Sequence, residues 1–289
     1  MADLTYHVVD VFTDVPFAGN PLAVVLGADE LSTEQLAALA REFNLSETAF
    51  PMRATEPGAD YLLRIFTPGS ELPFAGHPSV GAAWVMASLG RIAYGDVTMQ
   101  CGAGLLPLTV TADRVTLTAG TPSAGPPLGP APFLLALGLS PDDAGGAPAR
   151  ICSTGLRQAF VEVSSPEAVR GVVLDAVALS DAVGSDVETV SVFAWDEATR
   201  TAHTRVFAGM VGVGEDPATG SAASAFGAWL AASGYAQADG ETSYVVTQGA
   251  EIGRPSRMEG TVVTREGVAV ECRVAGSVVP IAAGTIRVP

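Results

Sequence analysis

Two short segments, one in each half of the chain, resemble each other in a way that limits the possible folds. Residues 76–83 read Gly-His-Pro-Ser-Val-Gly-Ala-Ala, and residues 215–222 read Glu-Asp-Pro-Ala-Thr-Gly-Ser-Ala. Each follows a strand pattern that contains arginine, at 64–66 and 205–207, and each predicts a helix with proline in its first turn, where the missing N–H costs nothing. Two such helix starts in matched settings predict a duplicated α/β unit.

The patterns around this repeat alternate between strands and helices. Ser32 and Gln35 form a capping-box pattern, and the apolar spacing that follows predicts a helix through Phe43. The second helix is expected to begin at His77 and Pro78. Apolar runs bounded by turns predict strands at 6–12, 22–26, 61–66, 159–163, 189–193 and 204–207.

The composition changes once along the chain. Residues 119–150 are rich in Ala, Gly and Pro, which favour turns and loops, and hold one short helix-like stretch near 133–137. We interpret this segment as the crossing into a second domain. The predicted domains are therefore 1–122 and 123–278, and the last strand, 279–289, can return to the first domain.

Charge and the choice of basic residue exclude several functions. The 289 residues carry 15 basic and 31 acidic side chains, a formal net charge of −16 that repels nucleic acid and anionic membranes. Every basic residue is arginine, so the chain cannot form a lysine Schiff base, and it lacks the lysine of a Walker-type phosphate loop. The sequence therefore favours chemistry that needs no cofactor.

Neither a metal site nor a membrane segment is indicated. Cys101, Cys152 and Cys272 are far apart, as are the three histidines, so no metal-ligand spacing exists. The N-terminus lacks the basic region and apolar region of a signal peptide, and no uninterrupted apolar run approaches about 18 residues. We expect a cytoplasmic protein whose cysteines are reduced and buried.

The two helix starts predict a site for an anion. If both N-termini meet at a domain interface, their free N–H groups and aligned peptide dipoles can hold a carboxylate without lysine or arginine. The residues that would form this site are Gly76, His77, Gly220 and Ser221. The alternative is that both helices simply begin with ordinary caps, with Asp216 as the N-cap of the second.

Glu47 is the candidate acid/base group. It stands between Ser46 and Thr48, where a helix ends and an apolar strand begins, so partial burial would raise its pKa toward a useful value. The competing interpretation is an ordinary solvated glutamate in a loop. His77 and Asp216 are the other titratable groups at the helix starts, and capping or packing would explain His77 equally well.

Several motifs together resemble the PhzF family of phenazine biosynthesis isomerases. They lie in order from the first strand to beyond residue 250, so the resemblance covers nearly the whole chain. The matching blocks are Asp10 to Phe12, Pro16 to Pro21, Asn44 to Thr48, Arg64 to Pro68, Glu71 to Pro78, Glu215 to Ala222, Gln248 to Gly249 and Gly253 to Ser256.

The resemblance implies the α+β fold of diaminopimelate epimerase. In that fold two similar domains each wrap a curved mixed sheet or barrel around a central helix, and the active site lies in the cleft between them. It also implies a homodimer, a small carboxylate substrate and no cofactor. The related epimerase uses two cysteines as acid and base, whereas the equivalent segments here contain none, which disfavours a two-cysteine racemase.

The resemblance also assigns roles to single residues. The type enzyme of the family isomerises trans-2,3-dihydro-3-hydroxyanthranilate by moving a proton between ring carbons, and its acid/base glutamate falls on Glu47. The other catalytic positions fall on His77 and Asp216. The substrate-binding positions fall on Ser46, Gly76, Gly220 and Ser221.

Two other functions stay open from the residues alone. An amino-acid epimerase or racemase could use Glu47 and Asp216 as bases on opposite faces of its substrate. A non-catalytic protein could use the same cleft to bind a small acid. Exchange of substrate protons separates the second alternative from an enzyme, and loss of optical rotation identifies the first.

Overall fold

The chain folds into two units. The computed structural model describes residues 3–183, 187–208 and 213–289. Unit 1 comprises Met1–Thr118 and Ala275–Pro289, and unit 2 comprises Ala119–Val274. The end of the chain belongs to unit 1 because β18 (Val278–Arg287) pairs antiparallel with β1 (Asp3–Val11).

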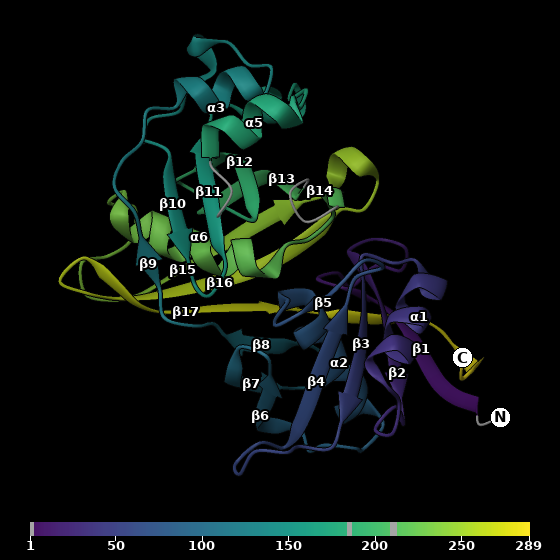
Figure 1. The fold of residues 1–289 in the computed structure, drawn as a ribbon. Helices are drawn as coiled ribbons and strands as arrows, with labels where there is room; N and C mark the ends of the chain where they lie inside the picture. The colour runs from purple at the N-terminus through teal and green to yellow at the C-terminus, as the bar shows by residue number, and fades with distance from the viewer. Residues whose placement is uncertain (1–2, 184–186, 209–212) are drawn as a thin grey trace. The chain divides into compact units, whose positions relative to one another are not determined.

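A mixed sheet with helices packed against it forms unit 1 (Figure 1). Between β1 and β18 its elements are β2 (Asn20–Leu26), α1 (Thr33–Phe43), β3 (Glu47–Met52), β4 (Tyr61–Phe66), β5 (Glu71–Leu72), α2 (Gly76–Ser88), β6 (Gly95–Cys101), β7 (Gly104–Val110) and β8 (Val115–Thr118). Pairing runs β18-β1-β2-β3-β4-β6-β7-β8, and β5 pairs with the end of β4. The β2–β3 and β4–β6 pairs are parallel, and the others are antiparallel.

The two helices of unit 1 are positioned differently. The predicted capping box of α1 is confirmed: Ser32 accepts a hydrogen bond from the Gln35 backbone, and the Gln35 side chain accepts one from Ser32 N–H. Leu36 and Leu39 of α1 pack in one apolar cluster with Phe50 of β3. Nearly all of α2 is buried against strands, as expected for a helix that is apolar on all sides.

Unit 2 also contains parallel and antiparallel strand pairs, together with helices. Its elements are β9 (Ser123–Ala124), α3 (Ala131–Ala136), η1 (Pro141–Asp143), β10 (Arg150–Ser153), β11 (Arg157–Glu162), α4 (Pro166–Arg170), α5 (Ala176–Val183), β12 (Thr189–Asp196), β13 (Thr201–Ala208), β14 (Val213–Asp216), α6 (Gly220–Ala232), β15 (Gly240–Gln248), η3 (Ala250–Ile252), β16 (Ser256–Arg265) and β17 (Val268–Gly276). Pairing runs β9-β10-β11-β12-β13-β15-β16, and β14 pairs with β13. The β11–β12 and β13–β15 pairs are parallel.

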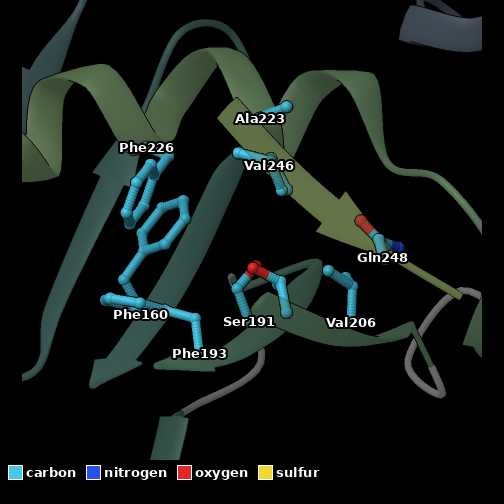
Figure 2. A pocket seen from close by; sticks show the side chains of 10 residues that line it. Phe160, Ser191, Phe193, Val206, Ala223, Phe226, Val246 and Gln248 are labelled. Atoms are coloured by element: carbon cyan, nitrogen blue, oxygen red, sulfur yellow. The ribbon is translucent and has the colours of Figure 1, made fainter. Parts of the chain in front are cut away.

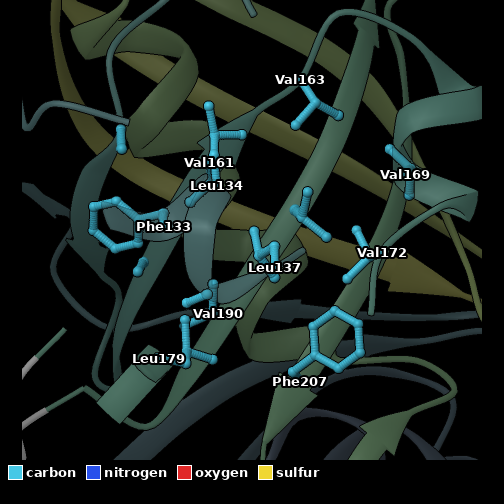
Figure 3. Close-up of a cluster of buried hydrophobic side chains, with 14 of the residues drawn as sticks. Phe133, Leu134, Leu137, Val161, Val163, Val169, Val172, Leu179, Val190 and Phe207 are labelled. Carbon is cyan, nitrogen blue, oxygen red and sulfur yellow. The ribbon is translucent and has the colours of Figure 1, made fainter. Parts of the chain in front are cut away.

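The apolar core of unit 2 includes a cluster between the short helices and the strands (Figure 3). Phe133, Leu134 and Leu137 come from α3 and its end, and they pack with Val161 of β11 and Val190 of β12. In a separate aromatic cluster, Phe193 of β12 packs against Phe226 and Trp229 of α6, which is buried along most of its length. The two most deeply buried helices, α2 and α6, have 13 residues each. No helix in the described part of the chain is long and apolar enough to cross a membrane.

The two units repeat one another in strand order. The segment β2-β3-β4-β6-β7 of unit 1 and the segment β11-β12-β13-β15-β16 of unit 2 share the same succession of parallel and antiparallel pairs. A short strand follows the third strand in each case, and the buried helix α2 or α6 comes next. The duplicated unit predicted from the two helix starts is therefore present.

The predicted starting residue of the second helix is wrong. Asp216 was expected to begin or cap this helix, but it is the last residue of β14, and α6 begins at Gly220 with Thr219 as its N-cap. In α2 the first residue is Gly76, so Pro78 lies inside the first turn while Pro217 lies before its helix. The proline positions therefore do not correspond, and the glycines at the two helix starts do.

Candidate active site

Glu47 and His77 lie side by side in unit 1. Glu47 is the first residue of β3, and His77 is the second residue of α2, which packs against β3. Their side chains are 13% and 5% exposed, and Glu47 Oε2 lies 3.4 Å from His77 Nε2. Phe50 faces α1, so the alternation of side chains along β3 turns Glu47 to the opposite face, toward α2. The fold thus brings together two of the predicted site residues.

A third residue links this pair to Ser46. Asn20, at the start of β2, is fully buried, and its Oδ1 accepts a hydrogen bond of 3.3 Å from Ser46 Oγ. Its Nδ2 donates to His77 Nδ1 at 3.3 Å. Because an amide nitrogen only donates, Nδ1 accepts, and the proton of a neutral His77 ring lies on Nε2, which faces Glu47. Asn20, Ser46, Glu47 and His77 form what we call the Glu47 half-site.

Burial sets the acidity of Glu47. Loss of solvent raises the pKa of Glu47 to about 7, and the polar Ser46 side chain beside it opposes this rise. The Oε2 atom is buried and makes no well-aligned hydrogen bond with the described residues. A carboxyl group with these properties can take up and return a proton near neutral pH.

Asp216 belongs to a second group, in unit 2. Its Oδ2 accepts a hydrogen bond of 2.6 Å from Thr219 Oγ1. The Gln248 side chain, at the end of β15, donates to the backbone oxygen of Asp216 at 2.7 Å and to Thr219 Oγ1 at 3.0 Å, and it accepts from Thr219 N–H at 3.2 Å. Asp216, Thr219, Gly220, Ser221 and Gln248 form the Asp216 half-site.

Both helix starts lack a side-chain cap. The N-cap residues are Ala75 for α2 and Thr219 for α6, and neither side chain accepts a hydrogen bond from the helix that follows. The first N–H groups of an α-helix have no partner within the helix, and the helix dipole favours negative charge beside them. The N–H groups of Gly76 and His77, and those of Gly220 and Ser221, are therefore suited to bind a carboxylate.

The strands before the two helices carry the same ion pair. Arg64 binds Glu71 through two hydrogen bonds of 2.7 Å, and Arg205 binds Glu215 at 2.9 and 2.7 Å. Each arginine also lies over a phenylalanine two residues later in the chain, at 5.1 and 5.0 Å from the ring centre. In each unit the glutamate stands opposite that phenylalanine in the strand pairing, five positions before the first helical glycine. The pair fixes the strand that leads into the helix.

Sequence reasoning missed Asn20 and Gln248 as parts of the site. Both stand in blocks that carried the family resemblance, but neither is titratable, and each lies far along the chain from the residue that it holds. Ser46 is predicted to bind substrate, and here its hydroxyl also donates to Asn20. The one indication in the sequence was that both amide side chains stand inside blocks that match the family.

The described residues offer no metal site, and the cavity beneath α6 is small. No set of three or more His, Cys, Asp or Glu side chains in the described ranges is arranged to hold a metal ion. The three cysteines are free and buried, as expected. A cavity beneath α6 is lined by Phe160, Ser191, Phe193 and Gln248 among others (Figure 2), but its volume of about 10 Å³ suits one water molecule and no organic substrate.

Known proteins resemble this chain along nearly its whole length. The family described as phenazine biosynthesis-like protein matches residues 9–284. The trans-2,3-dihydro-3-hydroxyanthranilate isomerase of Pseudomonas fluorescens is 35% identical over 294 residues, covering 97% of this chain and 98% of that protein. An uncharacterized isomerase of Pasteurella multocida is 34% identical over 296 residues, covering 98% and 94%. A solved PhzF-family structure from Bacillus anthracis has a TM-score of 0.88 at 25% identity and covers 99% of this chain and 100% of that chain.

The fold and the relatives define a sheet-rich α+β enzyme of the isomerase class. The chain belongs to the phenazine biosynthesis-like, or PhzF, family. The resemblance seen in the motif blocks is thereby confirmed.

Proposed function

We propose that this isomerase moves a proton between two carbons of a small cyclic or amino carboxylate, without a cofactor. The observation that carries the proposal is the Glu47 carboxyl group, which is largely buried, lies 3.4 Å from His77 and has a pKa raised to about 7. A group that ionises near neutral pH can act as a base and then as an acid in one turnover. The relative from Pseudomonas fluorescens is named trans-2,3-dihydro-3-hydroxyanthranilate isomerase, and its name supports an isomerase reaction on a small molecule.

The proposed reaction conserves all atoms. Glu47, as carboxylate, removes a proton from a substrate carbon next to a carbon–carbon double bond. The electrons of the broken C–H bond form a new double bond, and the original double bond shifts its electrons to its far carbon. That carbon receives the proton back from Glu47, so the carboxylate is regenerated. General acid/base catalysis of this kind contributes about 10²–10⁴-fold to the rate.

The other predicted residues would bind and orient the substrate. The uncapped N–H groups of Gly76, Gly220 and Ser221 would hold its carboxylate, as the two helix starts favour. His77 and Asp216 would hydrogen-bond its amino or hydroxyl substituents, and Ser46 would contact it beside Glu47.

The test is turnover of trans-2,3-dihydro-3-hydroxyanthranilate, followed by NMR in H₂O and in D₂O. Product should form with the wild type and fall below detection with Glu47→Gln. Glu42→Gln, an exposed change on α1, serves as the matched control and should leave the rate unchanged. Because one carboxylate can return the same proton, product formation decides the test and deuterium uptake supplements it.

Three outcomes would overturn parts of the proposal. Substantial turnover by Glu47→Gln would remove Glu47 as the acid/base group. Binding of the substrate to the wild type without any turnover, across a panel of cyclic and amino carboxylates, would indicate a binding protein. Loss of optical rotation from an amino acid without double-bond movement would indicate an epimerase.

Two further properties are proposed from the family resemblance. The protein is expected to be a homodimer, which light scattering after gel filtration tests. It is also expected to reside in the cytoplasm, which fractionation of the source cells tests. A monomer of 29.4 kDa in solution would contradict the first expectation.

A further inference from the structure

The Gln248-Gly249 and Gly253-to-Ser256 motifs lie beside the start of α6, although none of their residues is a candidate catalytic group. Gly249 has a φ of +78°, and a Cβ there would lie 2.5 Å from the Pro217 oxygen and 2.4 Å from the Arg254 oxygen. Ser256 Oγ lies 2.9 and 3.0 Å from the same two oxygens, which share its one hydroxyl proton. The end of β15 and the start of β16 thus close tightly around the 216–219 loop.

Gln248 uses every hydrogen-bonding atom of its amide on that loop. The side chain is 2% exposed, and Figure 2 shows it at the end of β15, beside α6. One N–H binds the Asp216 oxygen, the other binds Thr219 Oγ1, and Oε1 accepts from Thr219 N–H. A buried amide with three good partners fixes the groups that it contacts.

The directions of these hydrogen bonds determine which group donates to the Thr219 hydroxyl and which group accepts its proton. Since an amide nitrogen only donates, Thr219 Oγ1 must accept from Gln248, and its single proton goes to Asp216 Oδ2 at 2.6 Å. A threonine at an N-cap ordinarily accepts from the second or third N–H of its own helix. Thr219 makes no such bond, so the first N–H groups of α6 are left without a cap.

We propose that Gln248 is a positioning residue that keeps Thr219 from capping α6. It thereby aims the Asp216 carboxylate and leaves the Gly220 and Ser221 N–H groups open to the carboxylate of a substrate. The statement about substrate rests on the proposed function, whereas the statement about the Thr219 hydroxyl concerns the free protein. The two are tested separately.

Four variants test the proposal. Gln248→Leu releases the Thr219 hydroxyl, which then caps α6 and competes with the substrate carboxylate. Thr219→Val removes the hydroxyl that donates to Asp216 Oδ2, and α6 stays uncapped. The double variant combines the two changes. Gln158→Leu is the matched control, because Gln158 is also buried in unit 2 and bonded to a threonine, Thr189, at 2.8 Å.

The expected results differ among the variants. Gln248→Leu should weaken binding of anthranilate, used as a non-reacting aromatic carboxylate, by about fivefold, the cost of one competing cap hydrogen bond. Its kcat should fall by up to about 10²-fold, as for a displaced catalytic group. Thr219→Val should lower kcat while keeping the affinity for anthranilate, and the double variant should regain the affinity that Gln248→Leu loses. Gln158→Leu should lower thermal stability and leave kcat and affinity within about twofold.

Amide hydrogen exchange in the ligand-free protein provides the readout that is independent of function. Gln248→Leu should slow exchange in the first turn of α6, and the double variant should restore the wild-type rate. Unchanged exchange in Gln248→Leu, or no recovery in the double variant, would overturn the role of Gln248. Equal losses of affinity in Gln158→Leu and Gln248→Leu would also overturn it. If the exchange pattern holds and the wild type turns over no substrate, the proposed function fails and the positioning role stands.

Discussion

Glu47 should make the stability of the protein depend on pH in a specific way. Burial raises the pKa of this carboxyl group from 4.5 in the unfolded chain to about 7 in the folded protein. Between these values the unfolded chain releases a proton that the folded protein keeps. Stability therefore falls as pH rises from about 4.5, and the full contribution of the neutral carboxyl group is lost above about pH 7.

The size of the effect follows from the two pKa values. A rise from 4.5 to about 7 corresponds to a free energy of about 3 kcal/mol, at 1.36 kcal/mol for each pH unit. The Glu47 side chain is 13% exposed, so contact with water makes this figure an upper bound. Replacement by Gln keeps the shape of the neutral group and removes the titration. Glu47→Gln should thus match the wild type in pH dependence below about pH 4.5 and become relatively more stable, by up to about 3 kcal/mol, at pH 8.

Urea unfolding of wild type and Glu47→Gln at half-unit intervals from pH 4.5 to 8.5 measures this difference. Subtracting one curve from the other removes the titration of groups that the two proteins share. Glu42→Gln, with an exposed side chain, provides the control and should show no trend with pH. A difference between wild type and Glu47→Gln that stays constant within about 0.5 kcal/mol would refute the argument that burial sets the acidity of Glu47.

Three further changes test the site and its support. In the wild type, kcat/KM should rise with pH to a plateau above about 7, because only ionised Glu47 removes a proton, and a profile flat between pH 5 and 9 would contradict this. Asn20→Leu should destabilise the protein by about 1–3 kcal/mol in urea unfolding and lower kcat, since it removes the buried amide that donates to His77 Nδ1; unchanged kcat would show that the bond is structural only. Arg205→Met should lower the free energy of unfolding by about 3 kcal/mol, because it leaves the Glu215 carboxylate, which is 13% exposed, without its ion-pair partner. Arg53→Met, at a side chain that is 82% exposed, should lower it by less than about 1 kcal/mol. Equal melting temperatures of the two variants would contradict this comparison.

Local signals in the sequence were sufficient to predict a helix or strand wherever one short segment determines its structure. The capping box at Ser32 and Gln35 involves only neighbouring backbone, so its pattern predicts α1 directly. Apolar runs also located β1, β2, β4, β11, β12 and β13, with β4 at its full extent, because burial imposes their composition. The apolar residues after Glu47 favoured its partial burial but left a solvated loop glutamate open as the alternative, because the end of α1 before it is exposed; in the structure the side chain is 13% exposed.

The start of α6 could not be predicted in this way. Asp216 and Pro217 are good helix-start residues, and local preference places the N-terminus there. In the structure Gln248, 32 positions beyond Asp216, binds the loop and holds it outside the helix. A hydrogen bond between distant residues thus overrides the local preference. For the same reason neither amide, Asn20 nor Gln248, could be assigned a role before the strands were paired.

The two half-sites share a scaffold but differ in the chemistry they can support, and this difference bears on the reaction. Each has a buried helix with an uncapped start and an arginine–glutamate pair on the strand before it. Glu47, however, is a largely buried carboxyl group whose Oε2 makes no well-aligned hydrogen bond with the described residues, whereas one oxygen of Asp216 already accepts a hydrogen bond from Thr219. An epimerase that uses two bases needs comparable proton acceptors on both faces of its substrate. A reaction that uses Glu47 as its single base should therefore gain no racemase activity from Thr219→Val, which removes one hydrogen bond to Asp216 Oδ2.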